Sequence, residues 1–242
     1  MWVEPTTGIE FLYVAPARFR MGSAPDLAGR QRDETLHEVE ITRGFYLGRY
    51  EVTQKEWQEI MDHNPSQFAE CGPRCPVETV NYFVIQEFIT RLEERSAGNL
   101  FRLPTEAEWE LACRAGTESA FSSGDTLTTD QANFDGRYPA IGGPPGSFRG
   151  APSPVGSHPP NPWGFYDLHG NVWEWCGDWY GEYPAGPVRD PAGPPQGELR
   201  VIRGGSWAFD GNSARSALRY THAPEDDGYS LGFRLVREVA DR

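Results

Sequence analysis

Residues 200–237 read RVIRGGSWAFDGNSARSALRYTHAPEDDGYSLGFRLVR, and both ends of this segment are typical of strands. VIRGGSW predicts a strand that runs into a Gly-Gly turn, where glycine tolerates a positive φ, and LGFRLV predicts a second strand. Between them, residues 208–231 show no regular period of apolar side chains. We therefore expect an exposed segment that strands hold at both ends and that suits recognition better than core packing.

The composition predicts a chain with an ample core and many loops. The 242 residues are 38% hydrophobic and 13% aromatic, and they include 27 glycines and 21 prolines. A net charge of −13 argues against nonspecific binding to nucleic acid or anionic lipid, which both need basic surface. We find no apolar run of about 18 residues and no leader pattern at the N-terminus. The sequence thus predicts a soluble protein without a membrane span, cytoplasmic by default.

Three helices are predicted from their first residues. Thr53 with Glu56, and Thr105 with Glu108, have the spacing of capping boxes, and Asn81 is placed to cap a helix between them. Apolar residues follow each cap at helical spacing. We expect these helices to pack against the core.

The cysteines and histidines do not form a catalytic pattern. Cys71 and Cys75 lie in the tight loop ECGPRCPVE, where a local disulfide is possible but a metal clip would lack further ligands. Cys113 and Cys176 have apolar neighbours and are expected to pack as small hydrophobic residues. The five histidines show no recognisable spacing, and the sequence has no GxSxG, HExxH or phosphate-binding glycine loop. We assign no catalytic residue.

Two further segments favour a hard cation such as calcium. Residues 117–162 have no sustained period and form an uncommonly long loop, for which bound cations are one possible source of order. In GFYDLHGNVWEWCGDWY, residues 164–180, Asp167 and Glu174 bracket Gly170 and Asn171. Carboxylates and carbonyls of a tight turn suit calcium, although acidic residues near glycine are also typical of solvated turns.

Seven motifs in one order resemble a known family. They are RFRMGS, GFYLGRYEVTQKEW, CPVETVNY, FRLPTEAEWELACRAGT, GFYDLHGNVWEW, RVIRGGSW and LGFRLVR. Together they resemble the formylglycine-generating enzyme family, also called the sulfatase-modifying factor family. The resemblance implies an α+β fold: a single irregular domain over residues 1–242 of the C-type lectin-like type, with short mixed sheets, about three helices and long ordered loops.

The resemblance also implies structural calcium. One site would fall on the GNVWEW motif, with two side-chain and two carbonyl ligands: Asp167, Glu174, Gly170 and Val172. A second would fall in QANFDG at Asn133 and Phe134, but the carboxylate expected near Phe148 is missing.

The family's known chemistry lacks its ligands in this chain. The generating enzymes hold copper with a cysteine pair in the segment after the Gly-Gly turn, and thiolate is the ligand that suits Cu(I). Here the corresponding segment, SWAFDGNSARSALRY, contains no cysteine. We therefore predict that this chain is not a formylglycine generator.

Two functions remain open for the segment. In the first, it forms a recognition surface for an unknown protein or small ligand, and its residues would be Phe209, Asp210, Asn212, Leu218, Tyr220, Thr221, His222, Asp226, Asp227, Tyr229 and Ser230. This resembles the variable proteins of diversity-generating retroelements, and residues 208–230 lack Lys, Gln, Met and Trp, which adenine-directed mutagenesis of asparagine codons cannot produce. In the second, the chain is a metal-dependent oxidoreductase with ligands among Asp210, His222, Asp226 and Asp227, although one histidine with carboxylates makes a poor redox site.

Overall fold

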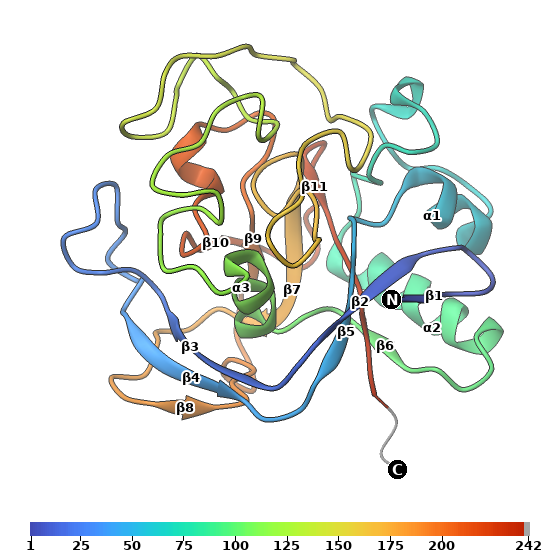
Figure 1. Ribbon diagram of the computed structural model, residues 1–242. Helices are drawn as coiled ribbons and strands as arrows, with labels where there is room; N and C mark the ends of the chain where they lie inside the picture. The colour runs from blue at the N-terminus through green and yellow to red at the C-terminus, as the bar shows by residue number, and fades with distance from the viewer. Residues whose placement is uncertain (240–242) are drawn as a thin grey trace.

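The computed structural model describes residues 1–239, so the last three residues of the predicted 1–242 domain lie outside the described part (Figure 1). Twelve short strands form its sheets: β1 Trp2–Val3, β2 Glu10–Val14, β3 Ala17–Met21, β4 His37–Ile41, β5 Phe45–Gly48, β6 Phe101–Arg102, β7 Trp173–Trp179, β8 Val188–Arg189, β9 Arg200–Arg203, β10 Tyr220–His222, β11 Leu231–Gly232 and β12 Val236–Arg237.

The helices begin where the caps predicted them. They are α1 Gln54–Met61, α2 Tyr82–Arg95 and α3 Glu106–Arg114. Thr53 and Thr105 each close a capping box with the glutamate three residues on, and the Asn81 side chain accepts from two N–H groups of the first turn of α2. Two short 3-10 turns, Ala69–Cys71 and Gly211–Ala214, complete the helical elements of the described residues.

The strands form three sheets around β7. The orders are β1-β2-β5-β12-β6, β10-β9-β7-β11 and β3-β4-β8. Figure 1 shows β7 near the middle of the molecule, with β9 and β11 beside it. Both ends of the 200–237 segment are strands as predicted, because VIR lies in β9 and the far end forms β11 and β12. Gly204 and Gly205 both have positive φ, which explains the Gly-Gly turn.

The long segment 117–162 is ordered without regular secondary structure. It has its own small apolar cluster, in which Phe121, Leu127 and Phe134 pack with Ala214 of the C-terminal segment. Backbone turns within the loop, such as the pairing of Phe121 with Gly124, satisfy part of its polar backbone. This apolar anchoring accounts for the long ordered loops that the family resemblance implied.

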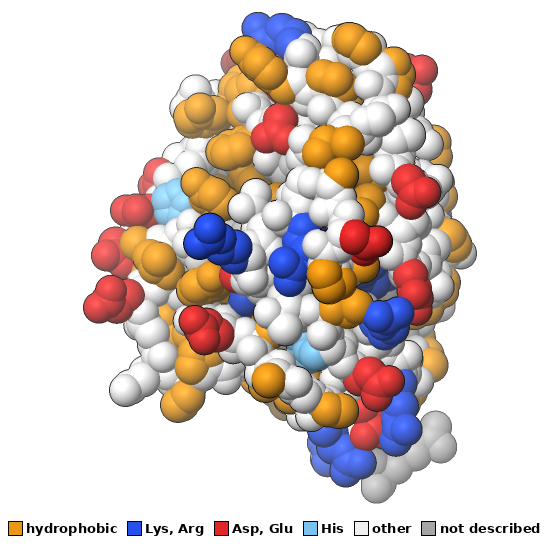
Figure 2. Space-filling model, turned by 90° about the vertical axis from the view of Figure 1, so that its left-hand side faces the viewer, with side chains coloured by type: hydrophobic (Ala, Val, Ile, Leu, Met, Phe, Trp, Pro, Cys, Tyr) orange, Lys and Arg blue, Asp and Glu red, His pale blue; other side chains and the backbone are white. Residues whose placement is uncertain are grey.

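The surface drawn in Figure 2 carries both hydrophobic and charged side chains. Hydrophobic side chains lie there in small groups among charged side chains of both signs, and no single apolar patch covers the described residues of this face. Within residues 1–239, no helix has the length and apolarity needed to cross a membrane.

Candidate functional site

The predicted recognition segment divides into two halves. From Gly211 to Arg219 every residue except Asn212 is buried, and we call this the buried half. From Tyr220 to Tyr229 only Pro224 is buried, and we call this the exposed half. Only part of the segment that sequence analysis predicted to be exposed is therefore available to a ligand.

Two residues predicted for the surface are buried, and that part of the prediction is wrong. Leu218 is 7% exposed and packs in the main hydrophobic core. Ser230 is 8% exposed, and its carbonyl accepts a hydrogen bond from the Trp173 backbone N–H where β11 meets β7. The lack of an apolar period hid both, since neither belongs to a regular element with a repeating face.

Two arginines account for the polarity of the buried half. Arg215 donates to both oxygens of Glu34 at 2.6 and 2.8 Å, and Arg219 donates to both oxygens of Glu106 at 2.7 and 2.8 Å. These four side chains are nearly inaccessible. A buried charge persists only with a partner, so these residues are structural ion pairs rather than recognition residues.

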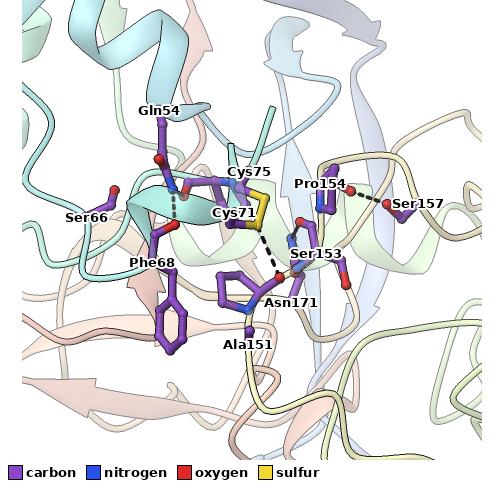
Figure 3. The surroundings of a disulfide bond; sticks show 12 residues. Gln54, Ser66, Phe68, Cys71, Cys75, Ala151, Ser153, Pro154, Ser157 and Asn171 are labelled. Atoms are coloured by element: carbon purple, nitrogen blue, oxygen red, sulfur yellow. Dashed lines mark hydrogen bonds between the residues drawn. A yellow bond between two sulfur atoms is a disulfide. The ribbon is translucent and has the colours of Figure 1, made fainter. Parts of the chain in front are cut away.

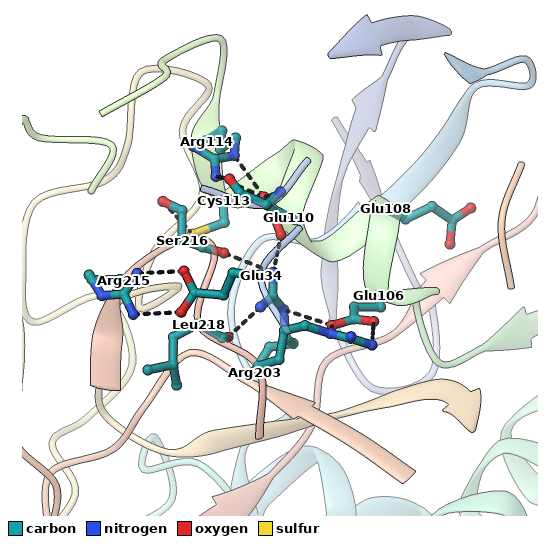
Figure 4. Close-up of polar contacts among 12 residues, drawn as sticks. Glu34, Glu106, Glu108, Glu110, Cys113, Arg114, Arg203, Arg215, Ser216 and Leu218 are labelled. Atoms are coloured by element: carbon teal, nitrogen blue, oxygen red, sulfur yellow. Dashed lines mark hydrogen bonds and ion pairs between the residues drawn. The ribbon is translucent and has the colours of Figure 1, made fainter. Parts of the chain in front are cut away.

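A third arginine joins β9 to α3 and to the buried half. Arg203 pairs with Glu110 and also donates to the carbonyl oxygens of Ser216 and Leu218, as Figure 4 shows. Burial alone would lower the pKa of Arg203, but Glu110 and the other acidic groups around it, Glu106 among them, together outweigh burial and the pKa is raised. The guanidinium therefore stays charged and fixes the path of the buried half.

Aromatic rings form the accessible part of the site. Tyr220 is 49% exposed and stacks on Trp173 with ring centres 5.4 Å apart, and Phe209 meets the same indole edge-on at 5.4 Å. Tyr229, 48% exposed, contacts Trp207 at 5.7 Å. Both tryptophans are buried, so they support the exposed rings from below.

Two aromatic residues from distant loops extend this group, and the sequence reasoning missed them. Phe68 meets Trp207 edge-on at 5.2 Å, and Phe148 lies 6.1 Å from the same ring. Arg137 in turn covers Phe148 at 3.9 Å. We name Phe68, Phe148, Phe209, Tyr220 and Tyr229 the aromatic surface. Phe68 and Phe148 lie in irregular loops, and their common neighbour Trp207 is apparent only in the folded structure.

The other predicted surface residues have mixed roles. Asp210 caps the 3-10 turn by accepting from the Asn212 N–H, and the Asn212 side chain accepts from the Ile141 N–H. These two residues therefore hold loops in place. His222 lies 3.5 Å from Asp226 in the exposed half, where Thr221 is partly exposed and Asp227 is exposed.

At the predicted first calcium site, the carboxylates already have partners. Both oxygens of Glu174 accept from Arg234 at 2.6 Å, and Trp109 Nε1 donates to one of them at 2.8 Å. Asp167 accepts from the Gly156 N–H. A third buried carboxyl, Glu51, binds the Asn171 side chain and the Val172 N–H, and burial followed by Asp167 and Glu174 raises its pKa. Sequence reasoning had not included Glu51.

The donor set does not fit a metal ion as these side chains stand. Within the described part of the chain, no group of three or more His, Cys, Asp or Glu is placed to hold one. The Gly170 N–H donates to Gly204, and at the predicted second site Asn133 Oδ1 is buried without a hydrogen bond while Phe134 packs in the loop cluster. Calcium binding at these residues stays a prediction.

The cysteines have the structural roles that the sequence suggested. Cys71 and Cys75 form a disulfide in the loop that follows Phe68 (Figure 3). Cys71 Sγ also lies 3.4 Å from the Pro152 carbonyl, so the disulfide contacts the long loop. Cys113 and Cys176 are buried thiols, and burial raises the pKa of Cys113 to about 12. Thiols of this kind are inert.

His169, which is partly exposed, is also held as a structural group. Its Nδ1 lies 2.8 Å from the Ala214 carbonyl, and its Nε2 accepts from the Ser122 N–H at 3.0 Å. Burial lowers the pKa of His169 to about 4, so the ring is neutral at physiological pH.

Comparison with known proteins gives the family. The sulfatase-modifying factor enzyme 1-like domain matches residues 3–239. The chain belongs to this family. Serine/threonine-protein kinase pkn1 of Chlamydia caviae is 41% identical over 259 residues, which cover 95% of this chain and 38% of the kinase. Formylglycine-generating enzyme of Streptomyces coelicolor is 39% identical over 148 residues, or 57% of this chain and 47% of that enzyme. The chain thus spans less than half the length of these relatives.

Solved structures confirm the predicted fold class. Treponema denticola variable protein 1 has a TM-score of 0.84 and 26% identity, with 98% of this chain and 97% of that chain covered. PvdO of Pseudomonas aeruginosa also has a TM-score of 0.84, with 30% identity and the same coverage. This sulfatase-modifying-factor-type chain is therefore an α+β C-type lectin-like domain, with three α-helices and short mixed sheets among residues 1–239.

Proposed function

We propose that this domain is a non-catalytic binding module and that the aromatic surface is its recognition site. One observation carries the proposal: exposed Tyr220 and Tyr229 rest on the buried indoles of Trp173 and Trp207. Aromatic side chains held in one conformation offer a large contact area and lose little conformational entropy on binding. The surrounding exposed half supplies acidic groups, so a partner with basic side chains suits the site best.

The anchoring of this segment supports recognition by variable residues. Strands β9 and β11 fix its ends, Arg203 and Arg215 fix its buried half, and the backbone of Tyr220–His222 in the exposed half pairs with β9. Substitutions at Tyr220, Thr221 and Tyr229 therefore leave the frame intact. The likeness to a variable protein of Treponema denticola supports the further proposal that these positions are diversified.

Genomic sequence tests the diversification directly. We expect a reverse transcriptase gene beside a near-copy of the segment coding for residues 206–237, with differences confined to codons of exposed residues. Differences at the codons of the buried Leu218 or Arg215 as frequent as those at Tyr220 would contradict this proposal.

No observation favours the alternative of a metal-dependent oxidoreductase. His222 and Asp226 are 3.5 Å apart, but the described residues bring no third ligating side chain to them. The segment after the Gly-Gly turn has no cysteine, and the buried Cys113 and Cys176 have raised thiol pKa values.

Crosslinking in the native host tests the binding function. A photoreactive phenylalanine analogue at Tyr220 or Tyr229 should yield a discrete crosslinked product. The matched control is the same analogue at Tyr13, which is 51% exposed on β2, away from the aromatic surface. Equal products from all three positions, or none from Tyr220 and Tyr229, would overturn the proposal.

A further inference from the structure

A cavity lies at the opposite end of β7 from the aromatic surface. Trp173, at one end of this strand, supports Tyr220, whereas Asp178 and Trp179, at the other end, line a cavity of about 380 Å³. Seven residues of extended chain separate these ends by about 20 Å. The volume lies in the range of sites for small molecules. The proposed function makes no use of this cavity.

Asp178 is a buried carboxyl with an incomplete set of partners. The residue is 4% exposed, and Oδ2 accepts from the Glu106 N–H at 2.8 Å. The described residues give Oδ1 neither a hydrogen bond nor an ion pair. Gly193 packs so close that an added Cβ would lie 3.0 Å from the Asp178 Cβ, so the adjoining loop encloses this carboxyl. Buried carboxylates normally have a cationic partner, and this one lacks it.

When Asp178 is ionised, the charges around the cavity leave an excess of negative charge. Glu106 lines it but is neutralised by the bidentate contact from Arg219, whose guanidinium also covers the Tyr183 ring at 3.7 Å. Glu182 lies exposed at the cavity and adds a second acidic group beside Asp178. A bound cation would therefore complete the local charge balance.

The walls are largely apolar or aromatic. Tyr183, Trp179 and the His37 ring line the cavity with three prolines, Pro184, Pro191 and Pro194. The Tyr183 hydroxyl is enclosed and has no hydrogen-bond partner. Such a lining suits an organic ligand with an apolar body and one charged group.

We propose that this cavity binds a small organic amine, with its ammonium group paired to the Asp178 carboxylate and its apolar part against the proline and aromatic walls. A neighbouring cavity of about 550 Å³ also reaches Asp178, and Arg102, which pairs with Glu108, lines it together with Asp190. We assign the amine to the Tyr183 side, where the proline and aromatic walls and the unpartnered Tyr183 hydroxyl lie.

Calorimetric titration with 2-phenylethylamine tests the proposal, with 2-phenylethanol as the uncharged control. The amine should bind with a submillimolar Kd and the alcohol at least about tenfold more weakly. Asp178→Asn, which keeps the side-chain shape, should weaken amine binding by about tenfold or more. Asp125→Asn, at an exposed carboxyl elsewhere, should leave the Kd unchanged.

Proton release on binding provides a second measurement of the proposed ion pair between the ammonium group and Asp178. Burial, followed by Glu106, raises the pKa of Asp178 to about 8, so most of this carboxyl is protonated at pH 7. The charged or titratable groups that influence it are Glu106, Glu108, Arg219, Arg200, Tyr82 and Cys176. Pairing with an ammonium requires the carboxylate, so binding at pH 7 should release close to one proton and binding at pH 9 close to none. The Kd should tighten about tenfold between these pH values.

A second variant tests the proposal in case Asp178→Asn fails to fold. Ala192 is exposed and lines the cavity, so Ala192→Trp should fill it, with Asp178 and the fold retained. We expect this variant to unfold like the wild type and to lose amine binding about tenfold or more. Equal binding of amine and alcohol, unchanged affinity in Asp178→Asn, or no proton release at pH 7 would each overturn the proposal.

Discussion

The two halves of the C-terminal segment have similar polarity but opposite surroundings. The buried half, Gly211–Arg219, contains Arg215 and Arg219, whereas the exposed half, Tyr220–Tyr229, contains three consecutive acidic residues and no arginine. The two arginines are buried because each pairs with a buried glutamate, whereas Glu225, Asp226 and Asp227 are exposed to water. Polarity alone therefore does not determine which half is exposed. The presence of an oppositely charged partner in the interior does.

The partners lie far away along the chain. Arg215 and Glu34 are 181 residues apart, and Arg219 and Glu106 are 113 residues apart. Each pair ties the segment to a different part of the domain, as Figure 4 illustrates for Arg215 and Glu34. The buried half thus acts as a structural anchor, and the exposed half is free to carry recognition.

Breaking one buried pair should have the largest effect. Arg215→Met leaves Glu34 buried without its cation and should lower the free energy of unfolding by about 3–5 kcal/mol. Arg91→Met, in the exposed pair with Glu87, should cost less than about 0.5 kcal/mol. Urea unfolding monitored by tryptophan fluorescence measures both. Similar losses of unfolding free energy in the two variants would show that burial does not determine how much an ion pair contributes to stability.

Asp178 provides the opposite case, a buried carboxyl that lacks a cation. Its pKa is raised from 3.8 to about 8 by burial and then by Glu106, so its contribution to stability is fully present below pH 4 and is lost as the pH rises toward 8. Asp178→Asn does not titrate and should be more stable than the wild type at pH 8, by about 1–3 kcal/mol. The difference should shrink at pH 5. Thermal unfolding of both proteins at pH 5 and 8 measures this difference in stability. A difference independent of pH would contradict the raised pKa of Asp178.

Reduction of the Cys71–Cys75 disulfide should have a smaller effect, because the loop that it closes is short. The loss of closure should lower the free energy of unfolding by about 2 kcal/mol. The measurement is urea unfolding with and without a phosphine reductant. The double variant Cys71→Ser, Cys75→Ser is the control, and it should not respond to the reductant. A response as large as that of Arg215→Met would give the loop a greater role than its length implies.

Local signals in the sequence predicted much of the frame. The capping residues Thr53, Asn81 and Thr105 placed the helices, because a cap is satisfied by N–H groups within three residues. The Gly204–Gly205 turn and the Cys71–Cys75 pair are equally local. Features of this kind can be recognised in a single sequence.

The candidate site was predicted only in part, because its decisive contacts are not local. Tyr220 and Tyr229 were identified from the segment itself, but Phe68 joins Tyr229 through the shared Trp207 ring. Leu218 was placed on the surface because no periodic pattern marks it as buried. The ion pairs that enclose it could be found only by matching each arginine with a glutamate elsewhere in the chain.

The exposed half should show the smallest effect on stability and a large effect on binding. Tyr220→Ala removes a ring that stacks on Trp173 but leaves the ion pairs of the buried half intact, so the free energy of unfolding should fall by only about 0.5–1 kcal/mol. Crosslinking from position 229 should nevertheless be lost in this variant, because both rings belong to one surface. Tyr13→Ala on β2 is the control and should retain it. A loss of stability comparable to that of Arg215→Met would mean that Tyr220 is part of the anchor and that the division into two halves is wrong.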